Sequence, residues 1–222
     1  MLAYSARHYP RHITESAGAA GVSSVAVREV GPLADAQPCQ VEFYSANGEI
    51  YAQGDRAAAL YQVEYGVVRL FRLLSDGRRQ ICAFHVAGEV FGFGVDARHH
   101  LFAEAVCDSA IRIYRRPLRE DSTMLSLTLK ELVRAQEHML VIGRQTAAER
   151  IAAFMVDLYD RLDGARNIEL AMSRSDIADY LGLTIETVSR VFSKFRSAGY
   201  IRLTGTRGLE IVQLDALKRL CA

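Results

Sequence analysis

Apolar and polar positions alternate through the first half of the chain, and apolar positions recur at helical intervals through the second half. Between about residues 38 and 115, short runs rich in Val, Tyr, Phe and Ile are separated by turn signals. Four glycines, spaced 12, 11 and 11 residues apart, mark this interval: Gly54, Gly66, Gly77 and Gly88. Such regular spacing is typical of an antiparallel roll. We therefore predict a jelly-roll of about eight strands, closed by Ile111–Tyr114.

After Pro117 the pattern predicts one long helix, from about Leu118 to Gln145. Six residues along it keep the alternating four-and-three spacing of a coiled-coil seam: Leu125, Leu129, Leu132, Gln136, Met139 and Gly143. Four other apolar residues lie off this seam, and we expect several of them to face the roll: Leu127, Val133, Leu140 and Ile142. The pattern favours a helix that pairs with its copy in a homodimer. The alternative is a helix buried wholly within one subunit.

Residues 173–197 carry the pattern of a helix-turn-helix. Ser173 and Asp176 predict a capped first helix, on which apolar residues recur at helical spacing: Ile177, Ala178 and Leu181. Gly182 ends this helix where the backbone φ angle is expected to be positive. Thr184 is a favourable cap for a second helix. Its expected buried stripe is Val188, Val191, Phe192 and Phe195.

The segments that flank this motif predict a winged domain. A helix from about Ala147 precedes the motif and ends at Asp163-Gly164. After the motif, Gly199–Leu203 and Leu209–Val212 are expected to form a β-hairpin wing with Arg207 at its tip. The expected fold is therefore α+β, in four parts: residues 1–35 as a flexible arm, 36–116 as the β-roll, 117–146 as the dimerisation helix and 147–222 as the winged helix-turn-helix domain.

Composition adds a local feature to this outline. The chain has 222 residues, half of them apolar, which suffices for one large or two modest domains. A net charge of +1 does not itself indicate a nucleic-acid partner, but residues 173–208 carry six basic and three acidic side chains. This local basic face suits phosphate contacts confined to one domain. Apolar runs stay well short of the roughly 18 residues of a membrane helix, and the first residues lack a signal-peptide core, so we expect a cytoplasmic protein without a membrane partner.

Three side chains of the second predicted helix point to DNA. Glu186, Ser189 and Arg190 lie at i, i+3 and i+4, so they share one face near the start of that helix. In a DNA-binding helix-turn-helix this part enters the major groove, where Arg, Glu and Ser can bond base edges. The alternative is an ordinary surface Glu–Arg pair. Neighbouring residues are candidates for phosphate contacts: Arg174, Thr184, Thr187, Lys194, Arg196, Arg202 and Arg207.

Metal, cofactor and catalytic sites lack comparable patterns. The four cysteines are scattered without a C-x-x-C pair, which disfavours closed zinc and all-cysteine iron–sulfur sites. Cys82 and Cys107 fall in strand-like runs and are expected to be buried. His85, His99 and His100 lack the ligand spacing of metal-binding rolls, and the adjacent pair should point to opposite sides of an extended chain. Catalytic triads, carboxylate pairs and P-loops do not stand out, so we expect no catalytic residue, metal or cofactor.

The order of roll, long helix and winged helix-turn-helix resembles the Crp/Fnr superfamily of bacterial transcription regulators, over about residues 38–215. Residues Glu186 to Arg190 are similar to the E-x-x-S-R motif of its Fnr-like branch, and SDIADYLGLTIETVSRVFSKF looks most like the FixK group. The resemblance implies that Arg190 reads a guanine, Glu186 a cytosine and Ser189 a thymine, in a two-fold site with TTGA-like half-sites. It also implies double-stranded DNA and RNA polymerase as partners of a homodimeric activator of low-oxygen respiration, nitrogen-fixation or denitrification genes.

Two departures bear on what controls such a regulator. The cyclic-nucleotide binders of this superfamily carry a Gly-Glu pair and, about ten residues later, an Arg among small residues. Gly88-Glu89 and Arg98 fit, but bulky His99 and His100 follow, and Glu104 would repel a phosphate. We therefore interpret Gly88-Glu89 as a retained turn. Residues 1–38 also lack the cysteine cluster of the oxygen-sensing members. The alternatives are a regulator gated by a cyclic nucleotide or haem, and a ligand-binding or enzymatic β-roll that does not bind DNA.

Overall fold

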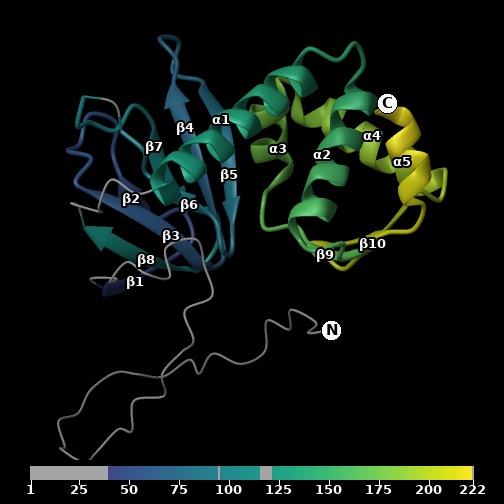
Figure 1. Ribbon diagram of the computed structural model, residues 1–222. Coiled ribbons are helices and arrows are strands. Elements are labelled where there is room, and N and C mark those ends of the chain that lie inside the picture. Colours follow the sequence, from purple (N-terminus) through teal and green to yellow (C-terminus); the bar gives the residue numbers. More distant parts are fainter. Residues whose placement is uncertain (1–39, 95, 116–121, 222) are drawn as a thin grey trace, which may run out of the picture. The chain divides into compact units, whose positions relative to one another are not determined.

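The computed structural model describes residues 40–94, 96–115 and 122–221 of the chain (Figure 1). The expected N-terminal arm, Cys39 and the first residues of the expected long helix lie outside the described residues. None of the described helices is long and apolar enough to cross a membrane.

Eight short strands build the first half of the described chain, which confirms the predicted jelly-roll (Figure 1). They form two four-stranded antiparallel sheets, in the orders β1-β8-β3-β6 and β2-β7-β4-β5. A cluster of buried side chains that includes Val63, Val68 and Ile111 forms part of the core. The strands are β1 Gln40–Tyr44, β2 Glu49–Tyr51, β3 Ala59–Tyr65, β4 Val67–Leu73, β5 Arg79–Val86, β6 Val90–Phe91, β7 Phe102–Ala105 and β8 Ser109–Arg115.

The prediction that Cys82 and Cys107 are buried within strands is only partly correct. Cys82 lies in β5 but is only half-buried, and Cys107 lies in the turn between β7 and β8. The turn was missed because β7 ends at Ala105, two residues before the cysteine, while the apolar run continues.

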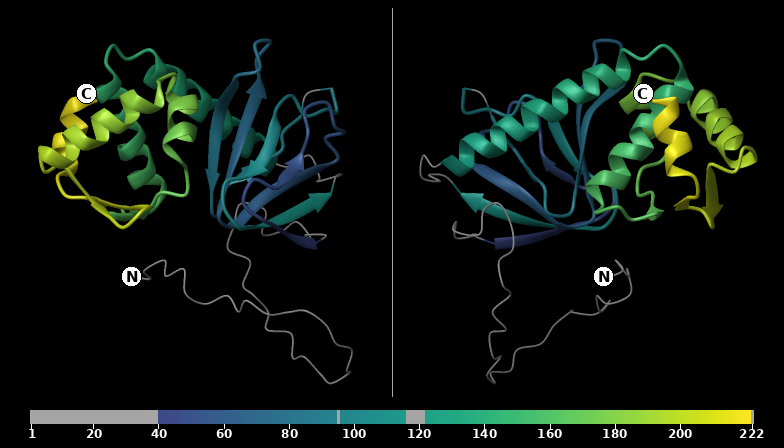
Figure 2. Two further views of the ribbon diagram at one scale, coloured as in Figure 1. Left: turned by 180° about the vertical axis from the view of Figure 1, so that it is seen from behind. Right: turned by 45° about the vertical axis from the view of Figure 1, so that its right-hand side comes forward.

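Helix α1, Ser122–Ile142, runs along the roll (Figures 1 and 2). It ends three residues before the expected Gln145, and residues 143–146 connect it to the next helix. Leu127 is buried against Leu60, Val90 and Tyr114 of the roll. Because Leu127 fixes this face inward, the opposite face of α1 is turned to solvent.

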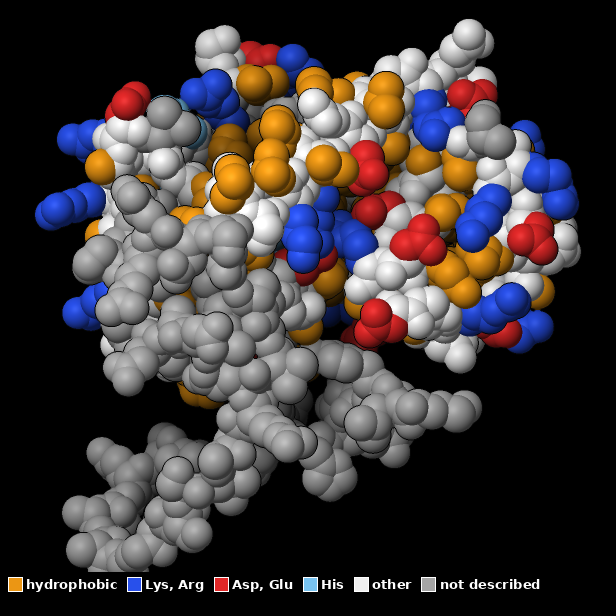
Figure 3. Space-filling view, in the orientation of Figure 1, with side chains coloured by type: hydrophobic (Ala, Val, Ile, Leu, Met, Phe, Trp, Pro, Cys, Tyr) orange, Lys and Arg blue, Asp and Glu red, His pale blue; other side chains and the backbone are white. Residues whose placement is uncertain are grey.

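The exposed face of α1 carries the predicted seam from Leu125 to Met139, and Gly143 follows directly after the helix ends. Leu125, Leu129, Leu132 and Met139 are 63%, 50%, 53% and 64% exposed, and Gln136 and Gly143 are also exposed. Of the four off-seam residues, among which several were expected to face the roll, Leu127 is buried and Ile142 is half-buried. Val133 and Leu140 do not face the roll, because they are 49% and 72% exposed. Each follows a seam residue directly, so it widens the same apolar stripe. Figure 3 shows this band of apolar side chains over α1. Burial of the helix within one subunit is therefore contradicted.

The remaining elements form the predicted winged domain, with one addition. The predicted helices and the hairpin are present, but β9 was not predicted because three residues show no measurable periodicity. It pairs with β11 to give a sheet in the order β10-β11-β9. The elements are α2 Ala147–Arg161, β9 Asn167–Glu169, α3 Arg174–Leu181, α4 Ile185–Ser197, β10 Ile201–Thr204, β11 Gly208–Ile211 and α5 Leu214–Leu220.

Candidate nucleic-acid interface

Helix α3 begins and ends as its sequence predicts. The Ser173 hydroxyl accepts a hydrogen bond from the Asp176 backbone N–H at 3.0 Å, and the Asp176 carboxylate accepts one from the Ser173 N–H at 3.0 Å. This reciprocal pair satisfies two backbone donors that the helix start leaves open. Gly182 ends the helix with φ of 63°, and its N–H bonds the Ala178 carbonyl. Such a positive φ favours glycine, so the chain turns here without strain.

Helix α4 is held by its buried face and presents the opposite face to solvent. Val188, Phe192 and Phe195 are buried in the core that α2 and α3 share. Thr184 caps the helix by accepting from the Thr187 N–H at 3.2 Å. The three predicted base-contacting residues lie together and exposed beside this cap: Glu186, Ser189 and Arg190. The structure therefore brings the predicted group together on one accessible surface.

The chemistry of this exposed face suits base edges. A hydrogen bond from its own backbone N–H, another from Thr184 and the nearby charge of Arg190 lower the pKa of Glu186, so its carboxylate is an ionised acceptor at neutral pH. Arg190 donates from Nη2 to the Thr187 hydroxyl at 3.2 Å. This bond to a neutral side chain holds the guanidinium at the exposed face, where it can present its fork of donors.

The predicted phosphate-contacting residues divide by environment. Lys194, Arg196 and Arg207 are exposed, as is Thr184, while Thr187 is half-buried. Arg202 is exposed but forms an ion pair with Glu210 at 2.6 Å. Arg174 is half-buried, and its guanidinium carbon lies 3.3 Å from the centre of the Phe192 ring. Arg174 thus packs on the core of α4, and its phosphate contact stays a prediction.

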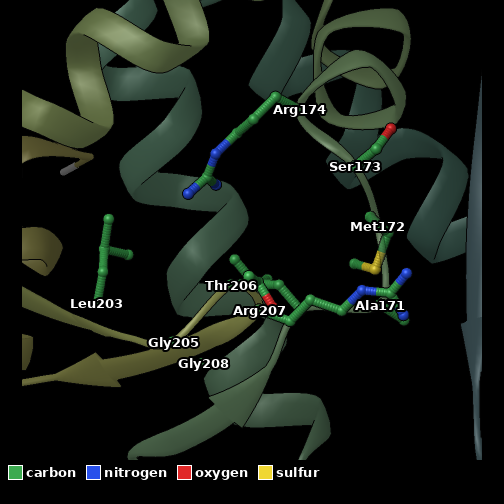
Figure 4. A pocket seen from close by; sticks show the side chains of 10 residues that line it. Ala171, Met172, Ser173, Arg174, Leu203, Gly205, Thr206, Arg207 and Gly208 are labelled. Carbon is green, nitrogen blue, oxygen red and sulfur yellow. The ribbon is translucent and has the colours of Figure 1, made fainter.

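A small cavity lies between the start of α3 and the wing (Figure 4). It has a volume of about 210 Å³ and is lined by residues 170–174, Leu203 and residues 205–208. Arg174 and Arg207 contribute its two cationic side chains, one from each element. Two cations beside a helix start favour an anion such as a phosphate.

An ion-pair cluster joins α3 to the roll. Asp176 accepts from Arg69 at 3.1 Å and from Arg79 at 2.7 Å, and the Arg69 and Asp176 side chains are 7% and 6% exposed. Arg79 also pairs with Asp179 at 2.9 Å. Glu104, which we expected to repel a phosphate, instead accepts from Arg69 at 2.6 Å. Asp176 therefore both caps α3 and ties that helix to strands β4 and β5.

Sequence reasoning missed this cluster, although one signal was present. Arg69 interrupts the apolar run of β4, and a charged side chain at such a position requires a buried partner. The partner lies 107 residues further along the chain, so local spacing cannot reveal it.

A second ion-pair cluster centres on Glu89, which lies in the Gly88-Glu89 turn before β6. One carboxylate oxygen accepts from Arg134 of α1 at 2.6 Å, and the other accepts from Arg161 of α2 at 2.7 Å and from the Val86 N–H at 2.9 Å. Burial is the largest single effect on Glu89 and opposes its ionisation, but the charge and hydrogen bonding of Arg161, together with the charges of its other neighbours, outweigh burial and lower the pKa. The carboxylate that a cyclic-nucleotide binder would offer to its ligand is thus already bound to two arginines.

The other residues of the cyclic-nucleotide pattern are also engaged in different contacts. Arg98 is exposed and donates to the Gly54 carbonyl at 2.6 Å. His99 is buried and stacks on Tyr51 with ring centres 3.6 Å apart, whereas His100 is exposed. The two adjacent histidines therefore lie in different environments, one buried and one exposed.

His85 predicts a pH dependence of stability. Its ring nitrogens lie 3.9 and 3.8 Å from Glu89 and Glu131 and make no hydrogen bond within the described part of the chain. Burial lowers the pKa of His85 to about 3 from its usual 6.5, and the charge of Glu89 opposes this only in part. Below pH 6.5 the unfolded chain binds a proton here that the folded chain excludes. Stability is therefore lost as the pH falls.

The test compares the wild type with His85→Gln by chemical denaturation. We expect the unfolding free energy of the wild type, relative to the variant, to fall by about 1.4 kcal/mol per pH unit between about pH 6 and pH 4. If the unfolding free energies of the two proteins changed with pH in the same way, His85 would not be held neutral in the folded chain.

The described elements define a class: a winged helix-turn-helix DNA-binding protein that also carries a β-roll and a long helix. Residues 149–220 match the Crp-like helix-turn-helix domain family, and residues 41–132 match the cyclic nucleotide-binding domain family. The chain belongs to the Crp/Fnr family of transcription regulators, within its FixK-like group.

Individual relatives support this assignment. The chain is 50% identical over 208 residues to the nitrogen fixation regulation protein FixK of Rhizobium meliloti (strain 1021), covering 93% of this chain and 99% of that protein. It is 39% identical to the protein of the same name from Bradyrhizobium diazoefficiens, covering 78% of this chain and 80% of the relative. The solved structure of FixK2 from Bradyrhizobium japonicum matches with a TM-score of 0.77 and 41% identity, covering 82% of this chain and 97% of that one.

Proposed function

We propose that this chain is a homodimeric activator that binds a two-fold DNA site with TTGA-like half-sites. The observation that carries the proposal is the exposed group Glu186, Ser189 and Arg190 at the start of α4, a helix whose other face is buried. Each subunit places α4 in a major groove, and the half-sites lie about 10 bp apart.

Each of the three side chains has a distinct partner on the bases. Arg190 donates two hydrogen bonds to O6 and N7 of a guanine, and Glu186 accepts one from the amino group of a cytosine. Ser189 contacts a thymine. The ionised state of Glu186 supports this assignment. A carboxylate can only accept hydrogen bonds, so it favours the amino group that a cytosine presents as a donor.

Phosphate contacts hold the protein in register. Three exposed cations serve this purpose most directly: Lys194, Arg196 and Arg207. Arg202 contacts a phosphate by exchanging its ion pair with Glu210 for one with the DNA. Arg174 and Arg207, which both line the small cavity, contact a phosphate there together. Thr184 and Thr187 supply hydroxyl groups at the start of α4.

The apolar face of α1 is proposed as the dimer interface. Its seam residues and the adjoining Val133 and Leu140 form a continuous apolar stripe that a second copy of α1 would cover. Two α4 helices related by a two-fold axis then meet two half-sites. The regulated genes are proposed to be those of nitrogen fixation or low-oxygen metabolism, since the FixK relatives are named for nitrogen fixation. We also propose that the protein acts in the cytoplasm and that the DNA-bound dimer contacts RNA polymerase.

Arg190→Ala tests the base contacts. The variant loses its bidentate bonds to guanine, so binding to the TTGA-type duplex is expected to weaken by about 1–3 kcal/mol, and discrimination at the guanine position is expected to vanish. The measurement is the dissociation constant, at fixed salt, for duplexes that carry each base at that position.

The matched control is Lys194→Ala, which removes a proposed phosphate contact. It is expected to weaken all duplexes alike and to reduce the salt dependence of binding. An Arg190→Ala protein that ranks the duplexes as the wild type does would contradict the proposed role of Arg190.

A further inference from the structure

Glu186 and Arg190 lie four residues apart on α4, a spacing at which opposite charges commonly pair along a helix. The glutamate precedes the arginine, which is the more favourable order for such a pair. Within α4, all of which the structure describes, these two side chains nevertheless form no ion pair. Arg190 instead donates from Nη2 to the Thr187 hydroxyl at 3.2 Å. A neutral side chain therefore holds a guanidinium that a nearby carboxylate would otherwise attract.

The Thr187 hydroxyl is itself held in place by the cap of the helix. The backbone N–H of Thr187 donates to the Thr184 hydroxyl oxygen at 3.2 Å, and a second hydrogen bond joins the two hydroxyl oxygens at 3.1 Å. The Thr187 side chain is half-buried, and its branched β-carbon restricts its rotation. The hydroxyl is therefore a well-positioned acceptor for Arg190. The bond uses one of the five N–H donors of the guanidinium, which leaves a pair for O6 and N7 of a guanine.

We propose that Thr187 is a positioning residue for base recognition, because its hydroxyl holds Arg190 away from Glu186 and leaves both charged groups free for the bases. This inference rests on the proposed function and gives Thr187 a role distinct from a phosphate contact. An ion pair between Glu186 and Arg190 would have to break before a guanine and a cytosine could be bound. A side chain that is already oriented also loses less conformational freedom on binding.

Thr187→Val tests the proposal on DNA, because valine keeps the shape of threonine and removes only the hydroxyl. Dissociation constants are measured at fixed salt for duplexes that carry each base at the guanine position of both half-sites. We expect the preference for guanine to fall about fivefold per half-site, the contribution of one hydrogen bond. Thr187→Ser keeps the hydroxyl and should retain the preference of the wild type. Loss of a phosphate contact alone would weaken all duplexes alike and leave the preference unchanged.

A titration of the Glu186 carboxyl by NMR tests the same proposal without DNA. In the wild type, the charge of Arg190 lowers the pKa of Glu186 less than the hydrogen bonds from its own backbone N–H and from Thr184 do. In Thr187→Val the released guanidinium should move towards the carboxylate, so the pKa of Glu186 is expected to fall further. The matched control makes the valine substitution in an Arg190→Ala protein, where that additional fall should be absent.

The outcomes that would overturn the inference are distinct from those that would overturn the proposed function. A Thr187→Val protein with the guanine preference of the wild type would overturn the role of Thr187 alone, and so would an unchanged pKa of Glu186. A wild type that binds TTGA-type and scrambled duplexes equally would overturn the proposed function, and the role of Thr187 in base recognition with it. Thermal unfolding of each variant verifies that the subunit is folded.

Discussion

Asp176→Ala is expected to lower the unfolding free energy by about 4 kcal/mol. Removing one partner of a buried ion pair costs about 3–5 kcal/mol because the other charge stays buried, and the lower end applies here because Arg69 keeps Glu104. Loss of the α3 cap adds about 1 kcal/mol to the cost of breaking the ion pairs. Chemical denaturation measures the change.

Two companion variants separate the roles of Asp176. Ser173→Ala removes the cap and leaves the ion pairs, so about 1 kcal/mol is expected. Asp179→Ala removes the more exposed partner of Arg79 and is expected to cost about 1 kcal/mol or less. An Asp176→Ala protein no less stable than Ser173→Ala would show that the pairs with Arg69 and Arg79 contribute nothing.

Leu132→Glu is expected to weaken dimerisation by at least about 100-fold while leaving the single subunit folded. The side chain is 53% exposed in the subunit, so the glutamate is solvated there. In the proposed dimer the substitution occurs twice, and each buried, unpaired carboxylate costs several kcal/mol. Sedimentation equilibrium measures the association constant, and DNA binding should weaken with it because a monomer meets one half-site.

The matched control is Lys130→Glu, a charge change on the same helix but away from the seam. It is expected to leave the association constant within about threefold of the wild type, as for an exposed substitution. Thermal unfolding of both variants confirms that the subunit is intact. A fully dimeric Leu132→Glu protein would place the interface elsewhere.

Features set by neighbouring residues were predictable from the sequence, and those set by distant partners were not. The α3 cap, the Gly182 turn and the exposed seam of α1 each depend on residues a few positions apart, so spacing alone predicts them. The Arg69–Asp176 pair depends on two elements far apart in the chain, and spacing carries no information on such a pairing. Val133 and Leu140 lie between these two cases. Their positions next to seam residues are set by the local sequence, but whether they are exposed depends on how far the roll extends along α1.

The grouping of the proposed DNA-contacting residues on one exposed face was predictable because all of them lie within one turn and a half of α4. The environment of single phosphate candidates was not. Arg174 is the example: its position at the start of α3 predicted a phosphate contact, whereas its packing on Phe192 depends on how α3 crosses α4.

The Glu89 and Asp176 clusters have a consequence for engineering. The two-domain architecture suggests that chimeras could be built, in which the DNA-binding domain of one regulator is joined to the β-roll of another. In this chain the graft boundary would cut the bonds from Arg161 to Glu89 and from Asp176 to Arg69. A functional hybrid would need to import matched charges on both sides of the junction, so promoter specificity here is less freely interchangeable than the two-domain outline suggests.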